Sequence, residues 1–159
     1  MGEIEGLDRL LKEHPFFQDM NPTVCTIIAG CAANERFNAG DYIFREGEPA
    51  DKFYLLRHGN VALEIHTPGR EPIIVETLQA GDILGWSWLV PPFKWRADAR
   101  AIQLVRAISL DAKCLRGKYE GDHDLGYELF KRFVPVMARR MEASRLQIID
   151  VYGKSRKIR

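Results

Sequence analysis

Residues 61–78 read VALEIHTPGREPIIVETL and carry the clearest folding signal in the chain. Two runs rich in β-forming residues flank a Pro-Gly pair, which favours a tight turn between strands. In the first run Val61, Leu63 and Ile65 fall on one face, because successive side chains of a strand point to opposite sides. The stretch therefore predicts an antiparallel hairpin.

Short segments of the same character extend on both sides of this hairpin, from Phe37 to about Leu110. Each is rich in Val, Ile, Tyr or Phe, and glycines separate them, among them Gly40, Gly47 and Gly59. Many short strands joined by regular turns are typical of a sandwich, a jelly roll or a small barrel. The sequence therefore predicts a mainly β domain.

Helices are predicted on the N-terminal side of the β region. Residues 6–14 place three leucines at helical spacing. Asn21 and Pro22 predict the start of a second helix, because asparagine is a good N-cap and proline fits the first helical position. The apolar positions of this second helix share one face, and they are Val24, Ile27, Ile28 and Cys31.

A long helix is predicted on the C-terminal side, where apolar residues follow a heptad pattern from Phe130 onward. One seam position holds Phe130, Met137, Ser144 and Val151, and the other holds Val134, Met141 and Ile148. Such a stripe fits a parallel homodimer, or alternatively it packs on the β domain. Pro135 is costly inside a helix, so it marks either the helix start or a kink.

Length and composition limit the classes of protein to which the chain can belong. With 159 residues, 46% of them hydrophobic, the chain suits one domain with a single core and a helical extension. The formal charge of +1 arises from 23 basic and 22 acidic residues, so no global field draws the chain to nucleic acid or to anionic membranes. Only residues 154–159, KSRKIR, are locally basic.

The compartment is predicted from the cysteines and from the lack of targeting signals. Cys25, Cys31 and Cys114 form neither a Cys-x-x-Cys pair nor a dense framework, and an odd count favours a reducing compartment. We therefore expect three buried thiols. No secretory leader or membrane-spanning run is recognised, so the cytoplasm is the predicted compartment.

Residues 81–101, GDILGWSWLVPPFKWRADARA, predict an anion pocket. Gly81 and Gly85 allow backbone amides to approach an anion closely. Arg96, in a segment that has the pattern of a strand, offers a fork of N–H donors suited to a bidentate clamp on phosphate or carboxylate. The stretch therefore predicts a site for a small negatively charged ligand.

Three segments occur in a characteristic order along the chain. They are GDYIFREGEPADKFYLLRHGNVAL at residues 40–63, GDILG at 81–85 with Arg96 after it, and MARRM at 137–141. Their order and spacing resemble the cyclic-nucleotide-binding domain of the catabolite-activator/FNR-type sensors. The resemblance implies a double-stranded β-helix, a jelly-roll-like β-roll, with N-terminal helices and a long C-terminal dimerisation helix. It divides the chain into a β-roll domain at 1–125, a dimer helix at 126–153 and a basic tail at 154–159.

The resemblance also implies a ligand site, built on a phosphate-binding cassette and on the dimer helix. Gly85, Arg96 and Ala97 match the cassette's glycine, its arginine and the small residue that follows. Trp86 stands where the family has the glutamate that accepts the ribose 2′-hydroxyl, and Ser144 aligns with the family's base-contacting serine or threonine. The candidate ligand-binding residues are Gly85, Trp86, Ser87, Arg96, Ala97 and Ser144.

Two departures from the family pattern affect this site. An indole has one N–H donor and no acceptor, so Trp86 leaves a ribose hydroxyl without its partner, at a cost of about 1 to 3 kcal/mol. Strand alternation places Arg96, Asp98 and Arg100 on one face. Asp98 then either points into the pocket and neutralises Arg96, or belongs to a solvent-facing ladder of ion pairs. Ser144 either contacts a purine edge or eases helix packing.

Three classes of function are compatible with these residues. The first is a stand-alone regulatory module that binds a small anionic, nucleotide-like ligand, by resemblance a cyclic nucleotide, as a homodimer. The second is a dimeric interaction scaffold whose pocket has closed. The third is a cupin-type metalloenzyme, which is disfavoured because His58 and His66 are separate and no His-x-His pair occurs. We therefore expect no enzyme, no catalytic or metal-binding residues and no cofactor.

DNA and membranes are not expected as partners. About eight residues follow Val151, too few for a helix-turn-helix, so the resemblance implies a sensor domain without a DNA-binding domain.

Overall fold

The chain folds into two antiparallel sheets with helices around them. The structure is a computed structural model that describes residues 2–157, with the side chains of 2–5, 8 and 154–157 excepted. The first sheet has the strand order β1-β8-β3-β6. Its strands are β1 (Ala32–Phe37), β3 (Lys52–His58), β6 (Ile83–Leu84) and β8 (Val105–Asp111). The basic tail predicted at 154–159 lies outside the described side chains.

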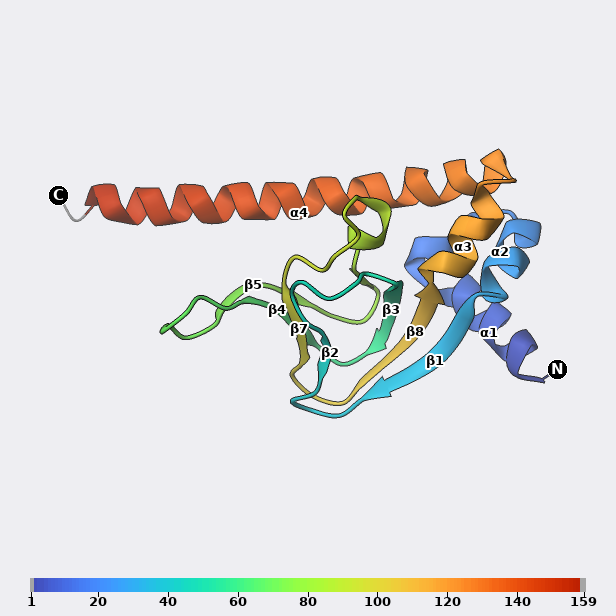
Figure 1. The fold of residues 1–159 in the computed structure, drawn as a ribbon, viewed down its shortest axis with the longest axis horizontal. Helices are drawn as coiled ribbons and strands as arrows, with labels where there is room; N and C mark the ends of the chain where they lie inside the picture. Colours follow the sequence, from blue (N-terminus) through green and yellow to red (C-terminus); the bar gives the residue numbers. More distant parts are fainter. Residues whose placement is uncertain (1, 158–159) are drawn as a thin grey trace.

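The second sheet has the strand order β2-β7-β4-β5. Its strands are β2 (Tyr42–Phe44), β4 (Val61–Ile65), β5 (Ile73–Leu78) and β7 (Asp98–Ala101). Apart from the hairpin of β4 and β5, successive strands belong to alternate sheets, so the polypeptide winds between them as a jelly-roll-like β-roll (Figure 1). This confirms the mainly β domain predicted from the glycine-separated strands and the β-roll implied by the family resemblance.

The predicted hairpin is confirmed in strands β4 and β5. They pair antiparallel, with Val61 opposite Leu78 and Ile65 opposite Ile73. Val61 is fully buried, Leu63 is buried and Ile65 lies at the exposed end of the strand. The alternating apolar face therefore points into the roll, and the hairpin projects beneath the C-terminal helix (Figure 1).

The two predicted N-terminal helices form, but the second ends at Ala29, so the prediction that Cys31 belongs to its apolar face was wrong. The helices of this region are α1 (Gly2–Glu13), the 3-10 helix η1 (Pro15–Phe17) and α2 (Pro22–Ala29). The side chain of Asn21 caps α2 by accepting a hydrogen bond of 2.8 Å from the backbone N–H of Thr23. Leu7 and Leu11 of α1 are buried against the rest of the core.

The C-terminal helix is longer than the heptad pattern predicts. After α3 (Ala112–Tyr119), helix α4 runs from His123 to Lys157 with Pro135 in its interior. Of the two alternatives predicted for Pro135, a helix start or a kink, the helix start is therefore excluded. The earlier start has a packing cause, because a different stripe, not the heptad seam, faces the domain. The residues of this buried stripe are Leu125, Leu129, Phe133 and Val136.

Aromatic side chains pack α4 against the β-roll. Phe133 meets Phe53 of β3 edge to face at 4.9 Å between ring centroids, and it meets Trp88 at 5.5 Å. Phe53 and Trp88 stack at 5.1 Å, and all three rings are fully buried. Such aromatic contacts add to the free energy gained from burial alone. The proximal half of α4 is therefore an integral part of the core.

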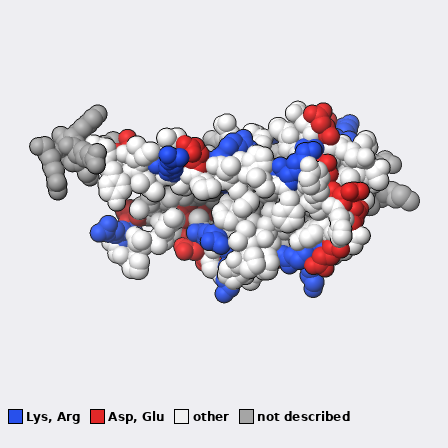
Figure 2. Space-filling view, turned by 90° about the horizontal axis from the view of Figure 1, so that it is seen from above, with Lys and Arg blue, Asp and Glu red and all other residues white. Residues whose placement is uncertain are grey.

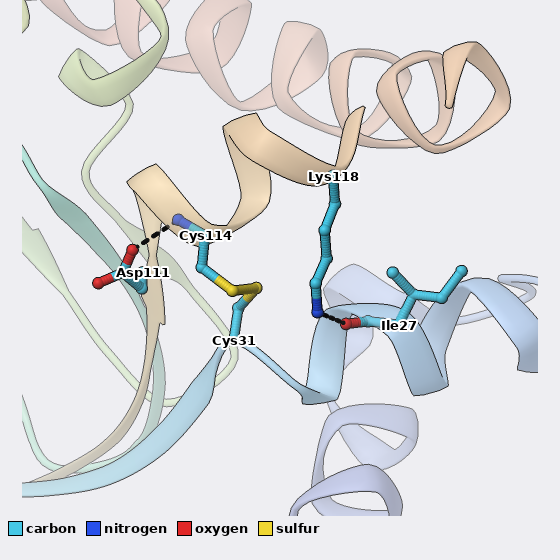
Figure 3. Close-up of a disulfide and its surroundings, with 5 residues drawn as sticks. All are labelled: Ile27, Cys31, Asp111, Cys114 and Lys118. Atoms are coloured by element: carbon cyan, nitrogen blue, oxygen red, sulfur yellow. Dashed lines mark hydrogen bonds between the residues drawn. A yellow bond between two sulfur atoms is a disulfide. The ribbon is translucent and has the colours of Figure 1, made fainter. Parts of the chain in front are cut away.

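The cysteines differ from the sequence-based expectation of three separate thiols. A disulfide joins Cys31, between α2 and β1, to Cys114 of α3, while Cys25 is buried outside this bridge (Figure 3). The Asp111 side chain caps α3 at the Cys114 N–H, 2.7 Å away. The prediction was wrong because packing of α3 beside the end of α2 brings together two positions that are 83 residues apart.

The distal half of α4 runs above the hairpin of β4 and β5 and ends beyond the hairpin tip (Figure 1). From Met141 to Tyr152 every residue is exposed, including large apolar side chains such as Met141, Ile148 and Val151. The β domain therefore leaves the seam residues Met141, Ile148 and Val151 uncovered. Within residues 2–157, no helix combines the length and apolar character needed to cross a membrane.

Candidate functional site

All six candidate ligand-binding residues line one cavity of about 230 Å³. The cavity lies between three parts of the fold: the segment after β6, the hairpin strands β4 and β5, and helix α4. Gly85, Trp86, Ser87, Arg96 and Ala97 come from the first part, and Ser144 comes from α4. Apolar side chains supply much of the remaining wall, and they are Phe44, Leu63, Ile65, Val75 and Trp95.

Gly85 occupies a position where a side chain does not fit. Its φ is +97°, in the left-handed region that favours glycine. A Cβ atom there would lie 2.7 Å from the ring of Trp95, whose indole stacks on Phe44 at 3.7 Å between ring centroids. The cavity floor is therefore a rigid aromatic stack that requires a glycine beside it.

Arg96 lies at the exposed rim of the cavity. Its guanidinium carbon stands 5.4 Å from the centroid of the Trp86 ring, within the range of a cation–π contact. Among the described residues, no carboxylate lies within ion-pair distance of Arg96. Its N–H donors thus remain available to an anion in the cavity.

Asp98 does not neutralise Arg96, contrary to one expectation from strand alternation. Its carboxylate accepts a 2.7 Å hydrogen bond from the Glu46 N–H and pairs with His66 at 2.9 Å and with Arg45 at 3.6 Å. Strand β7 begins only at Asp98, so the alternation does not extend back to Arg96.

The alternative of a solvent-facing ladder was also wrong for Asp98. Only 5% of Asp98 is exposed. Arg100 binds Glu64 instead, at 2.6 Å, and Glu64 is itself buried. The two acids are therefore buried, their more exposed basic partners cover them, and the Arg100–Glu64 pair joins β7 to β4 outside the cavity.

Trp86 contributes an aromatic wall where the resembling family has an acid. The residue is partly buried and begins the short helix η2 (Ser87–Leu89), whose first residue Ser87 is buried. The indole offers a donor but no acceptor. The indole can therefore pack against an apolar or aromatic group, but it does not itself accept a hydrogen bond from a sugar hydroxyl.

A second cation, which sequence reasoning missed as a site residue, lies deeper in the cavity wall. Arg140 of α4 donates a hydrogen bond to the Ile83 carbonyl and lies 3.5 Å from the carboxylate of Glu76 in β5. Burial lowers the pKa of Arg140, and the nearby Glu76 and Asp82 carboxylates partly offset that effect. The only sequence signal was its place in MARRM, which carries no information on burial.

Helix α4 meets the cavity mainly through small residues. Ser144 and Ala143 line the cavity, and Ser144 is exposed. One turn further along, the Gln147 amide donates to the Val75 carbonyl of β5 at 2.8 Å. A ligand in the cavity therefore touches the β-roll and α4 at the same time.

The α4 side of the molecule is largely uncharged. Figure 2 shows scattered lysine, arginine and acidic side chains separated by broad uncharged surface. The exposed apolar side chains of α4 contribute to that surface, and they are Tyr127, Phe130, Val134, Met141, Leu146, Ile148, Ile149, Val151 and Tyr152. Large apolar side chains left exposed along one helix commonly mark a protein–protein interface.

A larger recess, of about 550 Å³, lies elsewhere, between η1 and α4. Its Arg132 side chain already donates to the carbonyls of Phe16 and Gln18, at 2.7 and 2.8 Å. This recess therefore surrounds the joint between α4 and η1, and its size alone does not make it the ligand site. Among the described side chains, no group of three His, Cys, Asp or Glu is placed to hold a metal ion.

Comparison with known proteins places this chain in a family. The family model of the cyclic nucleotide-binding domain matches residues 34–122. The CRP-like cAMP-activated global transcriptional regulator of Mycobacterium tuberculosis is 24% identical over 145 residues, which are 91% of this chain and 63% of the regulator. Human cGMP-dependent protein kinase 2 is 34% identical over 91 residues, 57% of this chain and 11% of the kinase.

Solved structures give the same result for the fold. A protein from Geobacter metallireducens described as a cyclic nucleotide-binding protein has a TM-score of 0.75 and 26% identity, covering 84% of this chain and 97% of that one. The regulatory domain of Toxoplasma gondii PKA, crystallised with cAMP, has a TM-score of 0.64 and 28% identity over 72% of this chain and 44% of that one. The family match spans more than half of the chain, so the chain belongs to the cyclic nucleotide-binding domain family.

Proposed function

We propose that the chain is a regulatory sensor module that binds a small anionic, nucleotide-like ligand in the cavity between Gly85 and Ser144. The observation that carries the proposal is the placement of Arg96. Its guanidinium lies at the rim of a cavity lined by all six candidate residues and has no carboxylate partner among the described residues. An exposed, unpaired arginine of this kind suits a bidentate contact with a phosphate.

The cavity also provides a route from ligand to output. A ligand that contacts Arg96 and Ser144 touches the β-roll and α4 together. Binding shifts a conformational equilibrium only when the ligand contacts the two states differently. Because α4 is held here by few polar contacts, among them that of Arg140 with Glu76, occupancy of the cavity biases the position of α4.

The ligand class follows from the relatives and from the cavity wall. The named relatives include a cAMP-activated regulator and a cGMP-dependent kinase, which makes a cyclic nucleotide the first candidate. Trp86 removes the acceptor for a ribose 2′-hydroxyl and supplies an aromatic face. We therefore expect weaker cAMP and cGMP binding than a glutamate there would support, and a ligand with an aromatic base and a phosphate remains compatible.

We further propose that the chain acts as a homodimer through α4. The distal half of this helix exposes Met141, Ile148 and Val151 along the predicted seam. Pairing with a second copy buries this stripe, which a coiled coil does at heptad spacing. We propose no catalytic activity for this dimer.

The cytoplasm remains the compartment that we propose. Disulfides are rare there, so the bridge between Cys31 and Cys114 is then expected to be partly reduced. Trapping of free thiols in freshly lysed cells with a mass-labelled alkylating reagent measures the reduced fraction. A fully oxidised population contradicts the cytoplasmic assignment.

The experiment is isothermal titration of ligand-stripped protein with a panel of cyclic mononucleotides and cyclic dinucleotides. The proposal predicts saturable heat for at least one member and its loss in the Arg96→Ala variant. A panel without any heat removes the nucleotide-sensor function.

A dimeric scaffold without a ligand is the second candidate, and the cavity size favours it. The 230 Å³ found here is below the roughly 300 to 1,000 Å³ of typical small-molecule pockets. A thermal midpoint that no nucleotide or inorganic anion changes supports the scaffold, whereas a rise with one nucleotide supports the sensor.

A further inference from the structure

Three arginines from three neighbouring strands line a second recess, on a different part of the β-roll. Arg36 lies in β1, Arg106 in β8 and Arg57 in β3, and all three are exposed. The recess has a volume of about 330 Å³. It shares no lining residue with the cavity that contains Arg96.

The pairing of these strands places like charges together. Arg36 lies directly opposite Arg106 in the antiparallel register, and Arg106 lies opposite His58 on its other side. Like charges directly opposite each other destabilise a sheet. The net charge of the whole chain is only +1, so an overall excess of basic residues does not account for the cluster.

The described acidic side chains do not neutralise the charge of these three arginines. Among the residues with described side chains, none of the three arginines takes part in an ion pair. Glu35 lines the same recess; its Oε1 binds the Lys52 ammonium at 3.2 Å and its buried Oε2 has no hydrogen-bond partner, so this one acid does not balance three arginines. The recess therefore keeps a local excess of positive charge with N–H donors free for an external anion.

We propose that this recess is a second anion site and that it binds the diphosphate group of a small molecule. Guanidinium forks favour phosphate oxygens and bind them in pairs. Neighbouring strands lie about 4.8 Å apart, so arginines on three strands span more than a single phosphate covers. The volume of 330 Å³ falls within the range of small-molecule pockets, about 300 to 1,000 Å³.

The site is tested by isothermal titration with inorganic pyrophosphate in a phosphate-free buffer. Wild-type protein is expected to bind it, and the Arg106→Ala variant is expected to bind roughly tenfold more weakly or worse, because a charge-assisted contact is lost. Pyrophosphate binding that persists in Arg96→Ala but is lost in Arg106→Ala belongs to this recess, which separates it from any pyrophosphate bound in the cavity. Arg70→Ala, an exposed change in the hairpin turn, is the matched control for charge.

Comparison with ADP distinguishes the two sources of a diphosphate. Equal affinity for ADP and pyrophosphate assigns the site to the free diphosphate group. Tighter binding of ADP assigns it to a nucleoside diphosphate, with the nucleoside in contact with the protein. In both cases the affinity for pyrophosphate and for ADP is expected to fall as sodium chloride is added, because salt screens exposed charges.

The thermal midpoint gives a second, independent measurement. Arg106→Thr removes the like-charge pair and fits a strand, so without an anion this variant is expected to be more stable than wild type. Pyrophosphate is expected to raise the midpoint of wild type but not of Arg106→Thr. The proposal is overturned if wild type does not bind pyrophosphate, if Arg106→Ala binds it equally well, or if only Arg96→Ala abolishes binding.

Discussion

The guanidinium of Arg96 faces the indole of Trp86, 5.4 Å from the ring centroid, at the rim of the cavity. In this arrangement one side chain supplies the charge for a phosphate and the other supplies a flat apolar wall. The acid expected to compete for Arg96, Asp98, is bound to His66, Arg45 and a backbone N–H instead. The cavity therefore retains Arg96 as an available cation, but it has Trp86 where the family has the glutamate that accepts the ribose 2′-hydroxyl.

A glutamate at position 86 is expected to strengthen the binding of cAMP. Trp86→Glu supplies the missing acceptor for the ribose 2′-hydroxyl, a contact of about 1 to 3 kcal/mol, which corresponds to roughly one or two decades in affinity. Isothermal titration of both proteins measures the change. Trp86→Ala is the control, since it enlarges the cavity without adding an acceptor. An equal rise in cAMP affinity in both variants shows that the indole weakens binding by occupying space in the cavity, and not by lacking an acceptor.

Dimerisation through α4 is expected to fail when the seam carries a charge. Met141→Glu places a carboxylate at a seam position that is 71% exposed in the single chain, and charge in a desolvated interface is unfavourable. Light scattering after size exclusion is expected to give a dimer for wild type and a monomer for the variant. Ala138→Glu, one residue after a seam position and also exposed, is expected to remain dimeric.

Reduction of the Cys31–Cys114 disulfide is expected to lower the free energy of unfolding. The bridge spans 83 residues, and for a loop of this length the loss of chain entropy in the unfolded state is worth roughly 4 kcal/mol. Urea denaturation with and without dithiothreitol measures the difference. The free energy of unfolding of Cys114→Ala is expected to equal that of the reduced wild type and to stay the same when dithiothreitol is added. A variant that still responds to dithiothreitol contradicts this account.

His14 is expected to make the fold less stable in acid. Its Nδ1 accepts from the Phe16 N–H and its Nε2 lies 3.2 Å from the Leu56 carbonyl, an arrangement that suits the neutral ring. Burial lowers the pKa of His14 below 6.5, partly offset by the Leu56 carbonyl and Asp82, while Arg57 adds to the lowering. The unfolded chain then takes up the proton more readily than the folded chain. The contribution of the neutral His14 to the free energy of unfolding is therefore full above pH 6.5 and is lost as the pH falls through the lowered pKa.

Urea denaturation at several pH values between 7.5 and 5 measures this effect, in steps on the order of half a unit. His14→Asn keeps a side-chain acceptor for the Phe16 N–H but does not titrate, so its stability is expected to change less with pH. An unchanged pH dependence in this variant assigns the acid sensitivity to other groups.

Local sequence signals predicted those parts of the fold that depend on local chemistry. The Pro-Gly turn of the hairpin, the Asn21 cap and the order of strands and helices follow from such signals. The gathering of Gly85, Arg96 and Ser144 around one cavity followed from the family resemblance, because positions so far apart in the chain have no local signal that joins them.

Features that depend on tertiary packing were not predictable in the same way. The disulfide needs α3 beside the end of α2, which no cysteine count shows. The start of α4 follows from the burial of Leu125 and Leu129, a stripe distinct from the seam. The orientation of Asp98 depends on where β7 begins, and Arg140 became a cavity residue only once α4 lay on β5.

The most direct test of the account is titration of wild type and Arg96→Ala with the cyclic nucleotide that binds best in the panel, at the same ionic strength. The account predicts saturable binding to wild type and a loss of roughly tenfold or more in the variant, since a charge-assisted contact with phosphate is removed. Equal affinity in the two proteins, or no heat from any nucleotide, contradicts the claim that Arg96 binds an anionic ligand.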